Sequence, residues 1–408
     1  MSIKDYLNTT VSLFGAAFGL GCLMLPATMS AMGGPALWFI VYTFCIILNM
    51  ITFENIVYIG ETTGITDYMF VYTFFGKTKA KFIFTILFFV TNIGILLYAI
   101  FIYNEICTKM VKTITGTMSY LFDNEFSLLY LIIITVIFFP ILIKRQLKDL
   151  AILTYITMMA GVTLVAFLIF AYIKRSEINS LYEAQNTEGF QLKNLPSPFF
   201  TVFFSFVCQP NVLEIYDNLA VKSKNNMRKA FCLFFIMFSV LYIPIALCGY
   251  GVFKNHELIQ DQNILKLMPE NINHMMNLKI FFIIAQSLML IAALNSFIYL
   301  FKAVKDSILS FIETEKEGGQ VKKDLEIKNI LVTIFTMSGM NFFVGYCLVS
   351  DINSLTVLDV VTSQLTPILF VFPPVIIAWW KCKNIPSLLT GIIIGVLFVW
   401  NLILLILK

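Results

Sequence analysis

Charged residues are scarce in this sequence of 408 residues. Asp, Glu, Lys and Arg together make up 13% of it, whereas a soluble domain carries about 25%. Hydrophobic residues reach 59%. Such a chain cannot cover its apolar surface in water, which excludes a soluble enzyme, a disordered regulator and a secreted disulfide scaffold.

Histidine and the common metal and nucleotide motifs are also lacking. The two histidines, His256 and His274, fall in one loop, and the eight cysteines lie mostly inside apolar stretches. Neither pattern indicates a zinc site or a disulfide framework. A Gly-x-x-x-x-Gly-Lys-Ser/Thr loop is absent, which argues against ATP-driven pumping. We therefore expect no enzyme activity, no cofactor, no metal and no nucleic-acid partner.

Long uncharged stretches dominate the chain instead. Asp, Glu, Lys and Arg are missing from 6–53, 82–104, 126–143, 150–173, 194–213, 230–253, 280–301, 329–350, 360–380 and 384–407. A membrane-spanning helix needs about 20 apolar residues. The first stretch is twice that length and is interrupted by Gly33-Gly34-Pro35, so it predicts two spans. Because these runs do not alternate in polarity, we expect an all-helical integral membrane protein with eleven spans rather than a barrel.

Basic residues predict the orientation. With the N-terminus in the cytoplasm, 19 of the 28 lysines and arginines fall on the cytoplasmic side. The C-terminus is then extracellular or lumenal, in a plasma membrane or a vacuolar or lysosomal membrane. Residues 6–30 run directly into another span and are interpreted as the first helix, not a cleavable signal. We expect a monomer surrounded by lipid.

Two spans contain helix breakers near their middle. The first carries Gly19 and Gly21 before Pro26, and the sixth carries Pro210. The first and sixth of eleven spans correspond if 6–173 and 194–380 are inverted five-helix repeats and 384–407 is an extra helix, all within one transporter domain, 1–408. Paired interrupted helices indicate the substrate site of a secondary transporter. The alternative is that glycine and proline merely kink two membrane helices.

A broken helix exposes main-chain groups of both signs. Half-helices that begin at Gly21 or Asn211 offer N–H groups and a positive dipole end, which suit a carboxylate. Half-helices that end near Phe18 and Phe206 offer carbonyl oxygens, which suit an ammonium group or a small cation. An α-amino acid carries both groups.

Several motifs resemble one family. The first span reads Gly19-Leu20-Gly21-Cys22-Leu23-Met24-Leu25-Pro26, and the sixth reads Phe204-Ser205-Phe206-Val207-Cys208-Gln209-Pro210-Asn211-Val212-Leu213-Glu214-Ile215-Tyr216. With Gly249-Tyr250-Gly251-Val252-Phe253, Asn263-Ile264-Leu265 and the region from Val349 to Pro374, these strings are similar to the amino acid/auxin permease family, particularly its neutral amino acid transporter branch. The resemblance covers nearly the whole chain and implies the LeuT-type inverted-repeat fold.

The sequence departs from that family at positions that bear on the coupling ion. The sodium-coupled branch has Asn where this chain has Gly15, and Thr in its eighth helix where this chain has Ala293. A hard cation needs several oxygen ligands. The resemblance with these departures favours proton-coupled or facilitative transport over sodium coupling. Gln209 replaces a His of the sixth-helix string, and Glu214 replaces a Pro.

Polar and aromatic residues inside the spans complete the candidate site. We expect substrate contacts from Phe18, Gly19, Leu20, Gly21, Cys22, Asn92, Phe203, Phe206, Val207, Cys208, Gln209, Asn211, Asn295 and Thr362. Glu214 and Glu54 are proton-coupling candidates, because an intramembrane carboxylate is costly. The alternative is that these carboxylates pair with Lys222, Lys224 or Arg228. Trp38, Trp379 and Trp380 fall at span ends and are interpreted as interfacial anchors.

The sequence therefore predicts alternating-access transport of amino acids, most simply neutral ones. An amino acid sensor (transceptor) that binds without net transport is the alternative. A channel would need a continuous polar pore, and we find no repeated charged ring.

Overall fold

The computed structural model contains only helices in the part of the chain that it describes. The described residues are 3–64, 68, 79, 82–94, 136, 139–140, 142–143, 151–175, 195–219, 221–253, 264–267, 276–312, 321–349, 364–382 and 385–407. Most of the predicted fourth span, and parts of the third and tenth, lie outside these residues.

The first half of the chain contains the following elements. They are α1 (Ile3–Ala17), the 3-10 helix η1 (Leu20–Met24), α2 (Leu25–Ala31), α3 (Pro35–Thr63), the helix Phe82–Gly94 and α6 (Ala151–Ile173). The two glycines between α2 and α3 have φ angles of 76° and 126° at Gly33 and Gly34, a region that favours glycine. Pro35 then starts α3, as proline does at a first helical position. The long first stretch therefore holds two separate helices, as predicted.

The second half contains α8 (Pro196–Phe204), α9 (Gln209–Asp217), α10 (Lys224–Phe253), the short α11 (Ile264–Leu267) and α12 (Met276–Ile312). It continues with α13 (Val321–Val349), the π-helical turn η9 (Pro367–Val371), α15 (Phe372–Cys382) and α16 (Ile385–Leu407). The helices α12 and α13 extend well past their uncharged stretches into the charged segment 302–328. Helices continue beyond the hydrocarbon, where charged side chains are compatible with water.

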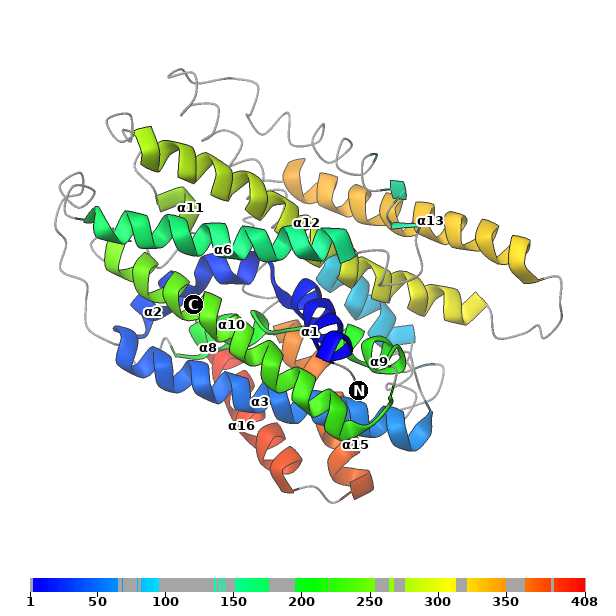
Figure 1. Cartoon of the computed structure of the whole chain (residues 1–408). Coiled ribbons are helices and arrows are strands. Elements are labelled where there is room, and N and C mark those ends of the chain that lie inside the picture. Colours follow the sequence, from blue (N-terminus) through cyan, green and yellow to red (C-terminus); the bar gives the residue numbers. More distant parts are fainter. Residues whose placement is uncertain are drawn as a thin grey trace.

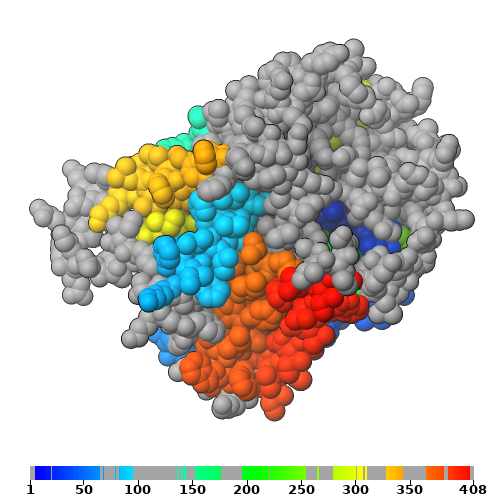
Figure 2. All heavy atoms as spheres, turned by 180° about the vertical axis from the view of Figure 1, so that it is seen from behind, coloured from blue at the N-terminus to red at the C-terminus, as the bar shows by residue number. Residues whose placement is uncertain are grey.

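The helix lengths fit a membrane protein. Among the described residues, six helices are long and apolar enough to cross a bilayer, or seven if the bent pair of α1 with η1 and α2 is one span. Eleven spans and a five-plus-five repeat stay predictions. Large apolar side chains are exposed on Phe82–Gly94, α13 and α16, including Phe82, Phe335 and Val396. Figure 2 shows these elements on one face, as expected of a surface in contact with lipid.

The long helices form a bundle around the two interrupted ones. α6 packs against both α10 and α12, and these three helices run side by side (Figure 1). α1 contacts α6, α9, α10 and α12, while α8 contacts α2 and α3. Phenylalanines such as Phe14, Phe18 and Phe206 are fully buried in this core. The interrupted helices are therefore enclosed by protein, where non-helical backbone is tolerated at membrane depth.

Candidate functional site

The first membrane-spanning helix is broken. α1 ends at Ala17, and the following η1 and α2 are bent away from it by 63°. Carbonyl groups just past the end of α1 accept hydrogen bonds from nearby side chains. Ser296 Oγ on α12 donates to the Phe18 carbonyl at 2.7 Å, and Cys22 Sγ donates to the Gly19 carbonyl at 3.1 Å. The main chain of the break is thus hydrogen-bonded to a side chain of α12.

The second break lies between α8 and α9. α8 ends at Phe204, and the chain is non-helical until α9 begins at Gln209. Pro210 explains the location, because proline is accepted in the first turn of a helix but clashes with the preceding turn in its interior. Tyr242 on α10 donates its hydroxyl to the Ser205 carbonyl at 2.9 Å, so one freed oxygen of the break is satisfied.

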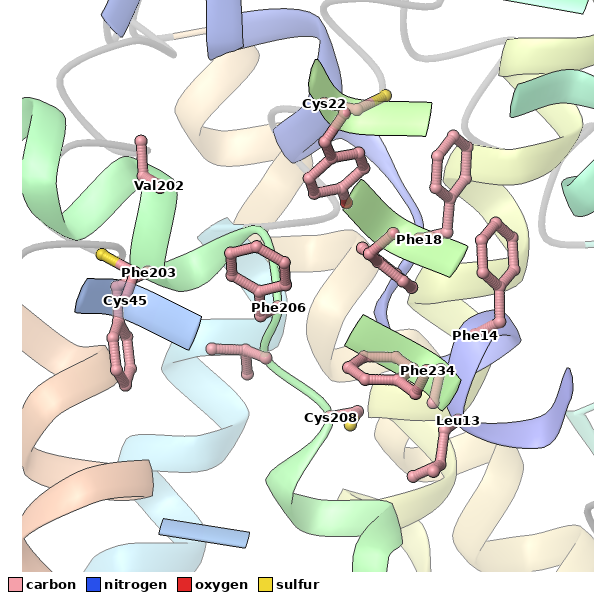
Figure 3. Packing of buried hydrophobic residues seen from close by; sticks show 14 of the residues in the cluster. Leu13, Phe14, Phe18, Cys22, Cys45, Val202, Phe203, Phe206, Cys208 and Phe234 are labelled. Atoms are coloured by element: carbon pink, nitrogen blue, oxygen red, sulfur yellow. The ribbon is translucent and has the colours of Figure 1, made fainter. Parts of the chain in front are cut away.

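The two breaks touch each other. A Cβ built on Gly21 would lie 2.7 Å from Ser205 Oγ and 3.1 Å from Ser205 Cα, so only glycine fits there without a shift. Phe18 and Phe206 both pack against the ring of Tyr242, with centroid distances of 5.8 and 5.5 Å. Figure 3 shows Phe206 and Cys208 on the linking segment, across from Phe18 and Cys22. Two stretches nearly 190 residues apart in sequence are therefore brought into contact.

A chain of carboxamides borders the second break. Gln209 Nε2 donates to Asn49 Oδ1 at 3.0 Å, and Asn49 Nδ2 donates to the Cys45 carbonyl at 3.0 Å. Gln209 and Asn211 are both buried. Within the described part of the chain, no hydrogen-bond partner reaches Gln209 Oε1 or Asn211 Nδ2. An acceptor and a donor thus remain unpaired at the start of α9, where a bound polar molecule can satisfy them.

The sequence of this chain matches a known protein family. A family model described as transmembrane amino acid transporter protein matches residues 5–402. This chain belongs to that family. The family resemblance inferred from the sequence motifs is confirmed, and the chain belongs to a family of multi-pass membrane transporters rather than of enzymes.

Solved structures share the transporter's fold at low sequence identity. MhsT in complex with L-phenylalanine is 14% identical, with a TM-score of 0.64 over 98% of this chain and 98% of that chain. A substrate-bound, outward-open Na⁺-coupled sialic acid symporter is 12% identical, with a TM-score of 0.59 over 96% of this chain and 88% of that chain. These likenesses concern the LeuT-type fold alone.

Most of the predicted site residues of the transporter gather at the breaks. Phe18, Gly19, Cys22, Phe203, Phe206, Val207 and Cys208 are buried there. The backbone of Leu20 and Gly21 lies in the same place, and the side chain of Leu20 and all of Thr362 lie outside the described residues. Asn295 contacts α1 and α6 instead, where its amide donates to the Gly15 carbonyl at 3.2 Å and to Thr157 Oγ1 at 3.0 Å. Asn92 donates to the Phe88 carbonyl of its own helix at 3.0 Å.

The carboxylates make ion pairs in the transporter. Glu54 on α3 forms an ion pair with Arg228 at 2.7 Å, without good hydrogen-bond alignment, and lies 3.9 Å from Lys224. This pairing is the alternative considered from the sequence. Glu214 on α9 instead contacts Lys302 Nζ on α12 at 2.6 Å, a partner that the sequence analysis did not identify.

Sequence reasoning also missed the side chains that stabilise the breaks. Tyr242 and Ser296 donate to break carbonyls, and Asn49 holds Gln209. A signal for Tyr242 exists, because a tyrosine hydroxyl inside an apolar span needs a partner. The sequence does not indicate which group accepts the hydrogen bond from the Tyr242 hydroxyl.

The tryptophan interpretation was wrong for Trp38. This side chain is fully buried and donates its indole N–H to Thr28 Oγ1 at 3.0 Å. It stacks on Tyr42 with a centroid distance of 4.8 Å. Trp379 and Trp380 are exposed, as expected of residues facing an interface.

Proposed function

We propose that this transporter carries neutral amino acids by alternating access and binds them between the two helix breaks. The observation that supports this most strongly is the contact of Gly21 with Ser205, because it brings four half-helix ends to one place. The N–H groups of Leu20, Gly21 and Gln209, at the starts of η1 and α9, have no partner within their own helices and suit the substrate carboxylate. The N–H groups of Cys22 and Asn211 already donate to the Gly19 and Cys208 carbonyls. The carbonyl ends of α1 and α8 suit its ammonium group. The Phe18 and Ser205 carbonyls accept one bond each from side chains, and an oxygen with two lone pairs accepts a second.

A neutral side chain fits the surroundings best. Among the described residues that line the breaks, the buried side chains are aromatic, aliphatic, thiol, hydroxyl or carboxamide groups, such as Phe206, Cys208 and Gln209. A charged substrate side chain would need an opposite charge to offset its desolvation. The carboxylates of Glu54 and Glu214 already pair with Arg228 and Lys302.

Sodium is disfavoured as the coupling ion. Gly15 and Ala293 offer no side-chain oxygen to a cation, and the Gly15 carbonyl accepts a hydrogen bond from Asn295. At Gly15 a Cβ would lie 2.3 Å from Thr154 Oγ1, so the Asn of the sodium-coupled branch does not fit this packing. We therefore propose proton-coupled or facilitative transport.

Glu214 is the proposed proton carrier. It lies on α9, the second half of a broken span, and it contacts α12 through Lys302. A proton on Glu214 would therefore change the contact between two separate elements. Glu54, the second candidate, lies on the continuous helix α3.

Uptake by the full-length protein in proteoliposomes tests this proposal. We expect uptake of labelled neutral amino acids, unchanged when external sodium is replaced by choline and stimulated by an inside-alkaline pH gradient. Glu214→Gln should remove the response to the pH gradient while exchange of substrate continues. Strict sodium dependence would contradict the assignment of the ion. Saturable binding without any flux would favour the sensor, and an equal pH response in Glu214→Gln would exclude that residue.

A further inference from the structure

A buried lysine lies near the end of α12 that the lysine bias predicts to be cytoplasmic. Lys302 is only 6% exposed. Its ammonium group contacts Glu214 Oε2 at 2.6 Å and Asp306 Oδ2 at 2.8 Å. Asp306 is one turn away on the same helix, whereas Glu214 is on α9. The interaction with Glu214 therefore joins the inner half of a broken span to a continuous helix.

Stability alone is a weak reason for this ion pair. Removing two charges from water offsets most of their attraction, and well-packed apolar side chains of the same volume are often as stable. Lys302 is buried whereas the Glu214 side chain is 30% exposed, so moving α9 away from α12 leaves a buried ammonium group with one carboxylate, Asp306, instead of two. Such a pair is suited to fixing α9 in one position rather than to raising the free energy of unfolding.

The same face of α12 also holds the other broken helix. Asn295, Tyr299, Lys302 and Asp306 follow at intervals of three or four residues and so share one side of the helix. At one end of this row, the uncharged amide of Asn295 donates directly to the Gly15 carbonyl of α1. At the other end, the contact with α9 is ionic. α9 is also held by Tyr216, which donates to Glu61 of α3 at 2.8 Å.

We propose that Lys302 is a positioning residue of the transport cycle, which holds α9 against α12 through Glu214 and keeps the cytoplasmic side of the site closed. The pair separates whenever that side opens. This inference rests on the proposed function for its role in transport, but closure itself is measured without substrate.

The accessibility of Cys208 reports on closure. Cys208 lies at the start of α9, inside the break, and is fully buried. Cys45 on α3 is buried to the same degree and serves as an internal control. The full-length protein in proteoliposomes is treated with N-ethylmaleimide, and the labelling of each cysteine is followed by peptide mass spectrometry.

In Lys302→Met we expect Cys208 to react at least tenfold faster while Cys45 keeps its rate. Tenfold corresponds to about 1.4 kcal/mol. Lys302→Arg should stay within about threefold of the wild type, because it preserves the charge. The double variant Lys302→Met with Glu214→Gln should match Lys302→Met rather than multiply its effect, because both changes remove one interaction. Lys222→Gln is the matched control, since it breaks an ion pair of Asp217 on α9 that does not reach α12.

An unchanged Cys208 rate in both Lys302→Met and the double variant would overturn the inference. A multiplied effect in the double variant would overturn it as well. If Cys45 accelerates equally in Lys302→Met, that variant has lost its fold. The Cys208 labelling rate of Glu214→Gln, a variant that leaves Lys302 paired with Asp306, then tests the inference in the same way. A wild-type protein that moves no amino acid would contradict the proposed function, whereas the labelling rates test closure independently.

Discussion

The contact between Gly21 and Ser205 predicts a sharp effect of one methyl group. In Gly21→Ala the new Cβ would lie 2.7 Å from Ser205 Oγ and 3.1 Å from Ser205 Cα. The hydroxyl can rotate away only by giving up its hydrogen bond to the Thr201 carbonyl at 2.9 Å, which costs about 1 kcal/mol. The backbone must then move as well, and overpacking of this kind costs about 1–3 kcal/mol.

We expect Gly21→Ala to weaken amino acid binding by about 2 kcal/mol, or roughly 30-fold. The assay is equilibrium binding of a labelled neutral amino acid to purified protein, with uptake in proteoliposomes alongside. Ser205→Gly in the same chain removes both Oγ and Cβ at the contact but leaves Ser205 Cα 3.1 Å from the new Cβ, so it should restore part of the lost affinity.

Gly395→Ala on α16 is the matched control. A Cβ at Gly395 meets nothing within 4 Å, so this variant should bind and transport like the wild type. The reasoning is refuted if Gly21→Ala binds as tightly as the wild type. It is equally refuted if Ser205→Gly brings no recovery while both proteins remain folded.

Two other variants test the side chains that stabilise the second break. Tyr242→Phe leaves the buried Ser205 carbonyl without its donor, and we expect a loss of about 1–3 kcal/mol in stability, measured as a lower Tm in detergent. An unchanged Tm would show that the carbonyl finds another donor. Asn49→Ala removes the acceptor of Gln209 Nε2, and we expect a similar loss together with weaker substrate binding, because Gln209 is then free to turn. Unaltered affinity would separate Gln209 from the substrate site.

The positions of the breaks were predictable from the sequence because helix breakers act locally. Gly19 and Gly21 weaken a helix wherever they stand, and Pro210 cannot lie in a helix interior without a clash. Gly33-Gly34-Pro35 likewise separates two helices in the structure, as it does in the sequence pattern. In these cases the cause lies within a few residues of its effect.

The partners of polar side chains were not predictable in the same way. Lys302 and Glu214 are 88 residues apart, and their contact depends on how α9 and α12 pack together. Trp38 begins a span in the sequence but is covered by the tertiary packing of Thr28 and Tyr42. A span boundary gives the depth of a side chain in the bilayer, but not the direction in which it points around the helix.

The four non-helical residues between α8 and α9 also have a mechanical consequence. An intact helix behaves as a stiff rod, so tilting one end displaces the other. Residues 205–208 interrupt the continuous ladder of main-chain hydrogen bonds between α8 and α9. α9 can therefore pivot at the break without dragging α8 with it, and the same holds for α1 and α2. Movement of a half-helix in one leaflet is therefore not transmitted to the half-helix in the other leaflet. One side of the protein can open while the opposite side stays closed.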